Sequence, residues 1–273
     1  MTEREQAWSD PNIVASRSVL VEVMTILASE VDKLVVVGGW VPELLYPGKG
    51  HIGLLDVDLA LDGRKIKPAA YDSIRKRLIE AGYRPASPTG SIFFRDVPGG
   101  SITVKLDLIT GEGAVPRDQE SHALIQEMFV GKLRGTDLAL DHAVSLTLTG
   151  AMPDGSVNEV HLRIADVAAF LCMKAHALNE RKREKDAYDV YFCLRACDGG
   201  PKVVAGSLQP LLGQSLVDEA VDILRTKFAA IDRVGPQWAA QVAAEHGEDF
   251  EQLARDAFER MAVLLKALEP SKP

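Results

Sequence analysis

The chain has 273 residues, enough for one large or two ordinary domains, and its hydrophobic content of 47% is typical of a globular protein. No apolar run approaches the roughly 20 residues that a membrane-spanning helix needs. A formal net charge of −8 argues against a protein that coats nucleic acid, because phosphate binding needs clustered lysine and arginine, but it leaves room for a local basic strip. The first residues, MTEREQAWSD, have no basic segment followed by an apolar one, so we expect no secretory signal and a cytoplasmic location.

The first elements follow from apolar spacing and from glycine. Residues 12–31 carry apolar side chains at helical spacing and predict an amphipathic helix. The β-branched run 35–37 predicts a short strand, and Gly38 and Gly39 directly after it predict a tight turn. Residues 40–46, with a proline in the first turn, predict a short helix.

Two acidic residues, Asp56 and Asp58, interrupt the next apolar run. In a strand, side chains two residues apart share a face, so both carboxylates should project together while Val57 and Leu59 face the core. Neighbouring carboxylates repel one another, and the pair is stable when a divalent cation lies between them or when one takes up a proton. The pair therefore predicts a site for a hard metal, although two exposed acids at a strand end remain the ordinary alternative.

A third carboxylate lies in residues 101–110, where apolar and polar side chains alternate and place Asp107 on the polar face of a strand. Together with residues 91–97 this strand predicts a hairpin across a Pro-Gly-Gly turn. Asp107 is the candidate third metal ligand. The ordinary alternative is an edge acid paired with Lys105 or another neighbour.

Further elements complete a sheet. Residues 71–81 predict a helix that ends at a glycine, whereas residues 111–134 show no clear period. Residues 143–148 and 157–164 alternate around a Pro-Asp-Gly turn and predict a second hairpin that closes the sheet.

After Ile164 the apolar spacing becomes helical, first over residues 166–178 and 185–197. We expect an α/β (α+β) fold, in which a mixed sheet with flanking helices, residues 1–163, precedes an all-helical domain, residues 164–273. The breaks expected between the later helices are Gly199-Gly200-Pro201 and Gly235-Pro236.

The first constellation resembles the nucleotidyltransferase superfamily that includes DNA polymerase beta. The matching features are the turn at Gly38 and Gly39, the pair Asp56 and Asp58, and the later strand residue Asp107. The resemblance implies that the glycines lie against nucleotide phosphates and that the three carboxylates are catalytic and hold two Mg²⁺ ions. Attack on the α-phosphate of a nucleoside triphosphate needs a lowered pKa at the attacking hydroxyl and neutralised charge at the leaving pyrophosphate, which two metals supply.

A second constellation resembles the AbiEii-like toxins of bacterial toxin-antitoxin and phage-defence systems. The matches are Lys174, Ala177-Leu178, Arg181 or Arg183, Lys185-Asp186, Asp189 and Tyr191-Phe192. The resemblance implies that Lys185 contacts the triphosphate, that Lys174, Asp186 and Asp189 belong to the nucleotide-binding set, and that the helical domain contributes to nucleotide or acceptor binding. The ordinary alternative is a charge network on a helix surface, with pairs that contribute about 0.2–1 kcal/mol each.

These patterns together predict a metal-dependent nucleotidyltransferase of the toxin type that transfers a nucleotide from a nucleoside triphosphate. The resemblance implies an acceptor such as the 3′ end of a tRNA or a protein side chain, and a cognate antitoxin as partner. The alternatives are transfer to a small molecule, as in aminoglycoside-modifying relatives, and a catalytically silent module that binds nucleotide or a partner. A metal-dependent glycosyltransferase also uses Asp-x-Asp, but gives no reason for the downstream Lys-Asp-x-x-Asp.

Overall fold

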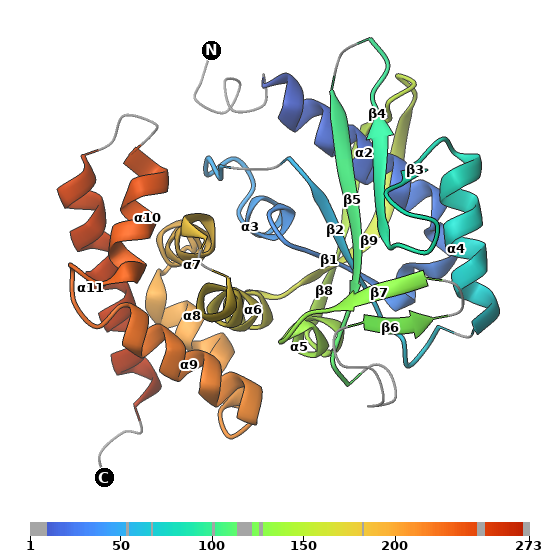
Figure 1. Ribbon diagram of the computed structural model, residues 1–273. Coiled ribbons are helices and arrows are strands. Elements are labelled where there is room, and N and C mark those ends of the chain that lie inside the picture. Colours follow the sequence, from blue (N-terminus) through green and yellow to red (C-terminus); the bar gives the residue numbers. More distant parts are fainter. Residues whose placement is uncertain are drawn as a thin grey trace. The chain divides into compact units, whose positions relative to one another are not determined.

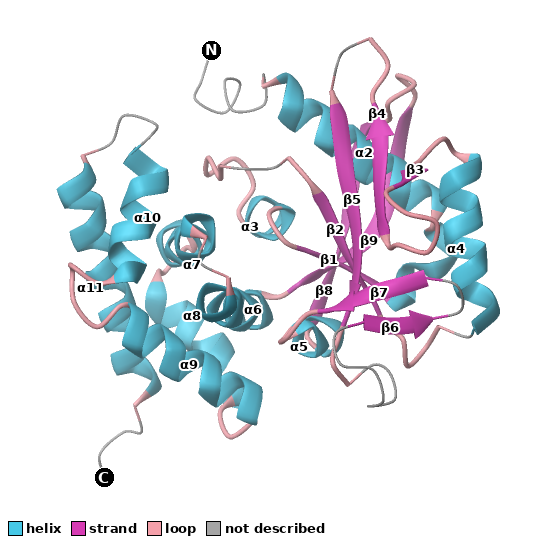
Figure 2. Ribbon diagram, in the orientation of Figure 1, coloured by secondary structure: helices cyan, strands magenta, loops and turns pink. Residues whose placement is uncertain are grey.

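The computed structural model describes residues 10–52, 55–66, 68–99, 102–113, 122–125, 128–181, 183–244 and 249–269. The chain divides into two compact units, the first ending at Asp166 and the second beginning at Val167. The strands belong to the first unit, and the described part of the second contains only helices (Figure 2). The predicted α/β class, with a mixed sheet and helices, is therefore confirmed.

The α-helices and strands of the first unit are labelled in Figure 1. Its elements are α2 (Pro11–Ile26), η1 (Ala28–Lys33), β1 (Leu34–Val37), α3 (Trp40–Leu45), β2 (Val57–Leu61), α4 (Pro68–Glu80), β3 (Arg84–Pro85), β4 (Ile92–Asp96), β5 (Thr103–Thr110), β6 (His122–Ile125), β7 (Met128–Lys132), α5 (Thr136–Asp141), β8 (Ala143–Ala151) and β9 (Val157–Ala165). The second unit consists of α6 (Val167–Glu180), α7 (Glu184–Ala196), α8 (Pro201–Leu208), η2 (Gln209–Leu211), α9 (Ser215–Lys227), α10 (Val234–Ala244) and α11 (Phe250–Leu268).

One mixed sheet organises the first unit. Its strand order is β3-β4-β5-β2-β1-β9-β8, with β7 also paired to β5 and β6 paired to β7. The pairs β2 with β5, β1 with β9 and β5 with β7 are parallel, whereas the other pairs are antiparallel. Both predicted hairpins, β4 with β5 and β8 with β9, are confirmed.

The two faces of the central strands have different surroundings. Val57, Leu59, Leu106 and Leu108 belong to the hydrophobic core, which also includes side chains of α2 and α4. Burying an aliphatic side chain of this size stabilises a fold by about 1.5–3 kcal/mol. The residues that alternate with them project from the opposite face of β2 and β5, and it is this face that carries the acidic side chains.

The structure corrects three predicted elements. The first helix ends at Ile26 rather than at residue 31, and a 3-10 helix continues the chain. Residues 111–134, for which we predicted no element, contain β6 and β7. Gly235-Pro236 does not separate helices but lies in the first turn of α10, where proline is tolerated because the first N–H groups of a helix have no intrahelical partner.

Some predictions fall outside the described residues. They concern residues 1–9, the hairpin turn and strand start at residues 100–101, and residues 114–121 and 126–127.

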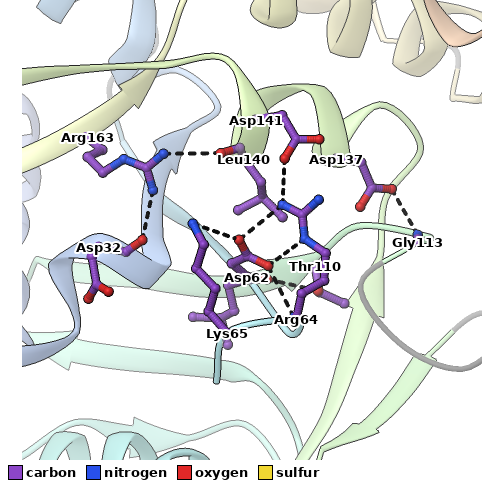
Figure 3. A network of polar contacts seen from close by, with 11 residues as sticks. Asp32, Asp62, Arg64, Lys65, Thr110, Gly113, Asp137, Leu140, Asp141 and Arg163 are labelled. Carbon is purple, nitrogen blue, oxygen red and sulfur yellow. Dashed lines mark hydrogen bonds and ion pairs between the residues drawn. The ribbon is translucent and has the colours of Figure 1, made fainter. Parts of the chain in front are cut away.

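A polar network closes the end of β2 that lies away from Asp56 (Figure 3). The buried carboxylate of Asp62 accepts hydrogen bonds from Arg64 Nε at 2.8 Å and Nη2 at 3.0 Å, and Lys65 Nζ lies 3.2 Å away. Arg64 also donates to Asp141 of α5 at 2.7 Å. Burial raises the pKa of Asp62, but the bonds from Arg64 and Lys65 outweigh it and hold that pKa below its ordinary value. The network joins α5 to the sheet.

In the second unit, α6 is buried along almost its whole length. It packs against α7, α8 and α9, and α10 packs against both α7 and α11. A helix that is apolar around its circumference forms the interior of a bundle. No helix in the described part of the chain is both long enough and apolar enough to cross a bilayer.

Candidate active site

Strands β2 and β5 bring two of the predicted acidic residues together. The strands are parallel, and Asp58 is in register with Asp107. Neighbouring strands lie about 4.8 Å apart, so the two carboxylates project side by side from the face opposite α2 and α4. Asp56 directly precedes β2 and is exposed. The predicted alternation therefore places Asp58 and Asp107 on one face of the sheet, with Asp56 just before the start of β2.

A lysine lies among these carboxylates. Lys105 Nζ is 3.5 Å from Asp56 Oδ2 and 3.4 Å from Asp107 Oδ2. Partial burial lowers the pKa of Lys105, but the nearby carboxylates outweigh this effect and raise it above its ordinary value. The ammonium group reduces part of the repulsion between the carboxylates, which we predicted a metal ion would neutralise. From the sequence we predicted Lys105 only as an alternative partner for Asp107. Its position two residues before Asp107 places both side chains on the same face of the strand, which is the signal that could have placed it in the site.

The donor type of the acidic cluster fits Mg²⁺, which binds carboxylate oxygens. A positive charge already lies between Asp56 and Asp107, so the position is one that a cation favours. In the described part of the chain, no group of three or more His, Cys, Asp or Glu side chains is arranged as a ready metal site. The carboxylates are therefore suitable ligands for Mg²⁺. In this structure the ammonium group of Lys105 lies between Asp56 and Asp107.

The turn after β1 is fitted to Asp58. Gly38 has a φ of 69°, a conformation that favours glycine, and a Cβ added to it would lie 2.0 Å from Asp58 Oδ2. Gly39 precedes α3 with an ordinary helical φ of −65°. The predicted tight turn is confirmed, and the structure adds a second reason for glycine at position 38. Contact of either glycine with phosphate stays a prediction.

A buried glutamate that the sequence analysis did not single out shapes the loop after α3. Glu43 is 4% exposed and accepts a hydrogen bond from the backbone N–H of Gly48 at 3.0 Å. Burial raises its pKa, and backbone N–H groups of Gly48 and His51 offset only part of this effect. The signal in the sequence is a single acidic residue within the otherwise apolar helix WVPELL.

The predicted polar residues of α6 and α7 form a cluster of their own within the second unit. Lys174 Nζ lies 3.0 Å from Asp186 Oδ1 and 2.6 Å from Asp189 Oδ2. Arg181 donates two hydrogen bonds to Asp186, both 3.0 Å long, and Lys185 Nζ lies 3.2 Å from Asp189 Oδ1.

Burial separates the members of this cluster. The side chains of Asp186 and Asp189 are 3% and 0% exposed, and that of Lys174 is 9% exposed. Burial lowers the pKa of Lys174, but the two carboxylates outweigh it and hold the pKa above its ordinary value. The side chain of Lys185 is 36% exposed. The cluster is therefore largely a buried ion network, in which Lys185 keeps an open side.

Comparison with known families assigns the chain. The model of the family described as nucleotidyl transferase AbiEii toxin, type IV toxin-antitoxin system, matches residues 55–262. The chain belongs to the AbiEii nucleotidyl transferase toxin family. The resemblance predicted from its motifs is confirmed, and the protein is a nucleotidyltransferase. The matched range includes the three acidic residues of the first unit and the ion network of α6 and α7.

Two Helicobacter pylori proteins of known structure are similar to this AbiEii protein. JHP933 is 14% identical, with 95% of this chain and 94% of that chain covered and a TM-score of 0.47. A candidate nucleotidyltransferase is 13% identical, with 95% of this chain and 97% of that chain covered and a TM-score of 0.46. A search of curated proteins found no match.

Proposed function

We propose that this AbiEii-family enzyme transfers a nucleotide from a nucleoside triphosphate to an acceptor hydroxyl with the help of Mg²⁺, and that the acceptor is the 3′ end of a tRNA. One observation carries the chemical part of this proposal. Asp58 and Asp107 lie in register on adjacent parallel strands, with Asp56 beside them. Carboxylates gathered around one cation in this way supply the donor type that a phosphate-activating metal needs.

In the proposed reaction, Asp107 accepts the proton of the acceptor hydroxyl. The hydroxyl oxygen forms a bond to the α-phosphorus, the bond from that phosphorus to the bridging oxygen breaks, and pyrophosphate leaves. Asp56, Asp58 and Asp107 would hold the metal, and Lys105 would have to give up its place between Asp56 and Asp107. Bound Mg²⁺ supplies charge neutralisation at the triphosphate and lowers the pKa of the attacking hydroxyl.

We assign the glycine turn and the helical unit to the triphosphate. Gly38 and Gly39 offer backbone N–H groups without obstructing side chains. Lys185 is the cation that contacts phosphate, which its partial exposure supports. The other members of the ion network act on the nucleotide indirectly. Asp189 positions Lys185, and Lys174, whose ammonium lies 2.6 Å from Asp189, fixes that carboxylate in turn. Asp186 positions Lys174.

The partner that the toxin-antitoxin description of the family implies is a cognate antitoxin. A small-molecule acceptor is the second candidate, and the net charge of −8 favours it, because an acidic protein attracts RNA weakly. A protein acceptor and a silent binding module are outcomes that the following experiment separates.

The test uses the purified chain with Mg²⁺, each α-labelled nucleoside triphosphate in turn, and either total tRNA, a cell extract freed of RNA, or aminoglycosides as acceptor. The matched variants are Asp58→Asn at the site and Asp222→Asn on α9, where the side chain is 73% exposed. We expect label in tRNA with the wild type and Asp222→Asn, and none with Asp58→Asn. Label in a small molecule or a protein would overturn the tRNA acceptor, and transfer by Asp58→Asn would overturn the site.

A further inference from the structure

A cavity of about 420 Å³ opens beside Asp107 within the first unit. Its walls are contributed by β4, β5, β7 and the segment 86–91 that joins β3 to β4. This volume falls within the roughly 300–1,000 Å³ of small-molecule sites. Neither the family description nor the acidic cluster by itself assigns a ligand to this cavity.

The cavity shares its floor with the acidic cluster. Asp107 and Ile109 are two apart on β5 and project from the same face. Ile109 is paired with Gly131 of the parallel strand β7, and Phe129 lies two residues before Gly131. The face that carries Asp58 and Asp107 therefore continues onto β7, and the cavity is built over this continuation.

The segment 86–91 is fixed to both neighbouring strands. The backbone N–H of Phe129 donates to the carbonyl oxygen of Thr89 at 2.7 Å, and that of Leu108 donates to the carbonyl oxygen of Ser91 at 3.1 Å. Gly90 forms a β-bridge with Phe129. The wall of the cavity is thus joined by backbone hydrogen bonds to β5 and β7, so it is formed before any ligand arrives.

The lining combines two kinds of group that recognise a nucleotide. Phe129 is 45% exposed, although an aromatic ring of this size is usually buried, and it offers a surface on which a base stacks. Ser87, Thr89 and Ser91 add hydroxyl groups, which donate to and accept from base edges or ribose.

The strand order indicates whether the cavity would hold the nucleoside triphosphate or the acceptor. In the sheet, β1 lies on one side of β2 and β5 lies on the other. The glycine turn follows β1, whereas the cavity lies at β5, β4 and β7, so the two flank the acidic cluster on opposite sides. We propose that the cavity holds the terminal nucleotide of the acceptor, with its base on Phe129 and its hydroxyl at Asp107. This inference rests on the proposed function, which places the triphosphate at the glycine turn.

Gly131 provides a direct test. A Cβ added to Gly131 meets no atom within 4 Å, so Gly131→Val should place a branched side chain in the space where the base would lie. Phe129→Ala removes the stacking surface. The matched controls are Gly206→Val on α8, where an added Cβ also meets nothing, and Phe250→Ala on α11, where the ring is 39% exposed.

Two binding constants are measured for each variant, one for total tRNA and one for non-hydrolysable analogues of the four nucleoside triphosphates, together with thermal unfolding. We expect Gly131→Val and Phe129→Ala to weaken tRNA binding at least tenfold, with analogue binding within twofold of the wild type. Weaker analogue binding with unchanged tRNA binding would assign the cavity to the donor and overturn the proposal. Unchanged binding of both, or no tRNA binding by the wild type, would also overturn it.

These outcomes are distinct from failure of the proposed function. That failure appears as nucleotide transfer by Asp58→Asn or as label in another acceptor, and neither depends on Gly131 or Phe129. If Gly131→Val unfolds at a lower temperature than the wild type, Phe129→Ala, which adds no volume, decides the proposal.

Discussion

The carboxylate of Asp58 lies in the space that a side chain on residue 38 would need, with Oδ2 2.0 Å from a Cβ built on Gly38. Because Gly38 directly follows β1 and Asp58 lies on the neighbouring strand β2, the turn and the acid can adopt these positions only together. Glycine here makes room for a catalytic candidate of the same chain, whether or not it also contacts phosphate.

We predict that Gly38→Ala abolishes nucleotide transfer, because the added methyl group displaces the Asp58 carboxylate. The positive φ alone costs about 1–2 kcal/mol, so the change also destabilises the fold. Gly155→Ala is the matched control, since Gly155 has a φ of 86° and an added Cβ there meets no atom. Transfer assays and urea unfolding measure both effects. Equal activity and stability in the two variants would show that the contact with Asp58 is unimportant.

Lys105 and Mg²⁺ should compete for the acidic cluster. We predict that Lys105→Met lowers the Mg²⁺ concentration needed for half-maximal thermal stabilisation by up to about fivefold, which corresponds to the roughly 1 kcal/mol at the upper end for a partly exposed ion pair. Lys76→Met on α4, where the side chain is 69% exposed, is the control. An unchanged or higher Mg²⁺ requirement in Lys105→Met would contradict the competition.

The ion network of the second unit separates stability from activity. We predict that Asp189→Asn destabilises the fold by about 3 kcal/mol, because it removes a charge that faces the buried ammonium of Lys174. Lys185→Met should change the free energy of unfolding by less than about 1 kcal/mol, since its side chain is partly exposed, but should reduce transfer. Urea unfolding and transfer assays test both variants. Full activity in Lys185→Met would remove this lysine from the nucleotide site.

The lowered pKa of Asp62 makes the stability of the folded chain depend on pH. An unperturbed aspartate has a pKa of about 3.9, and the unfolded chain retains this value. In the folded chain the pKa of Asp62 lies below it. Its contribution to stability is therefore complete above the unfolded pKa and is lost as the pH falls through the folded pKa. We expect Asp62→Asn to be less stable than the wild type at pH 7, and the difference in unfolding free energy to shrink below about pH 4. A difference that stays constant from pH 7 to pH 3 would contradict this assignment.

Much of the fold was predictable because it rests on short-range patterns. Alternation in residues 101–110 and 157–164 predicted strands that the structure contains, since one face of each strand packs against an apolar core. The missed strand β7 has five residues, and its parallel partner β5 lies far away in sequence. A strand this short shows little periodicity. It pairs with the neighbouring strand β6 as well as with β5, and neither β6 nor β7 is long enough to show a clear alternation.

The sequence by itself determined the family, the hairpins and the face on which Asp58 and Asp107 project, because these depend on residue type and on a two-residue repeat. Only the tertiary structure decided which groups surround each charge. It placed Lys105 Nζ between Asp56 and Asp107, and the lysine at position 174 within 3.0 Å of two buried carboxylates. The contacts of Lys105 with Asp56 and of Lys174 with Asp186 and Asp189 join separate elements, so strand register and helix packing decide them. The contact of Lys105 with Asp107 differs, because their two-residue spacing already places both on one face of β5.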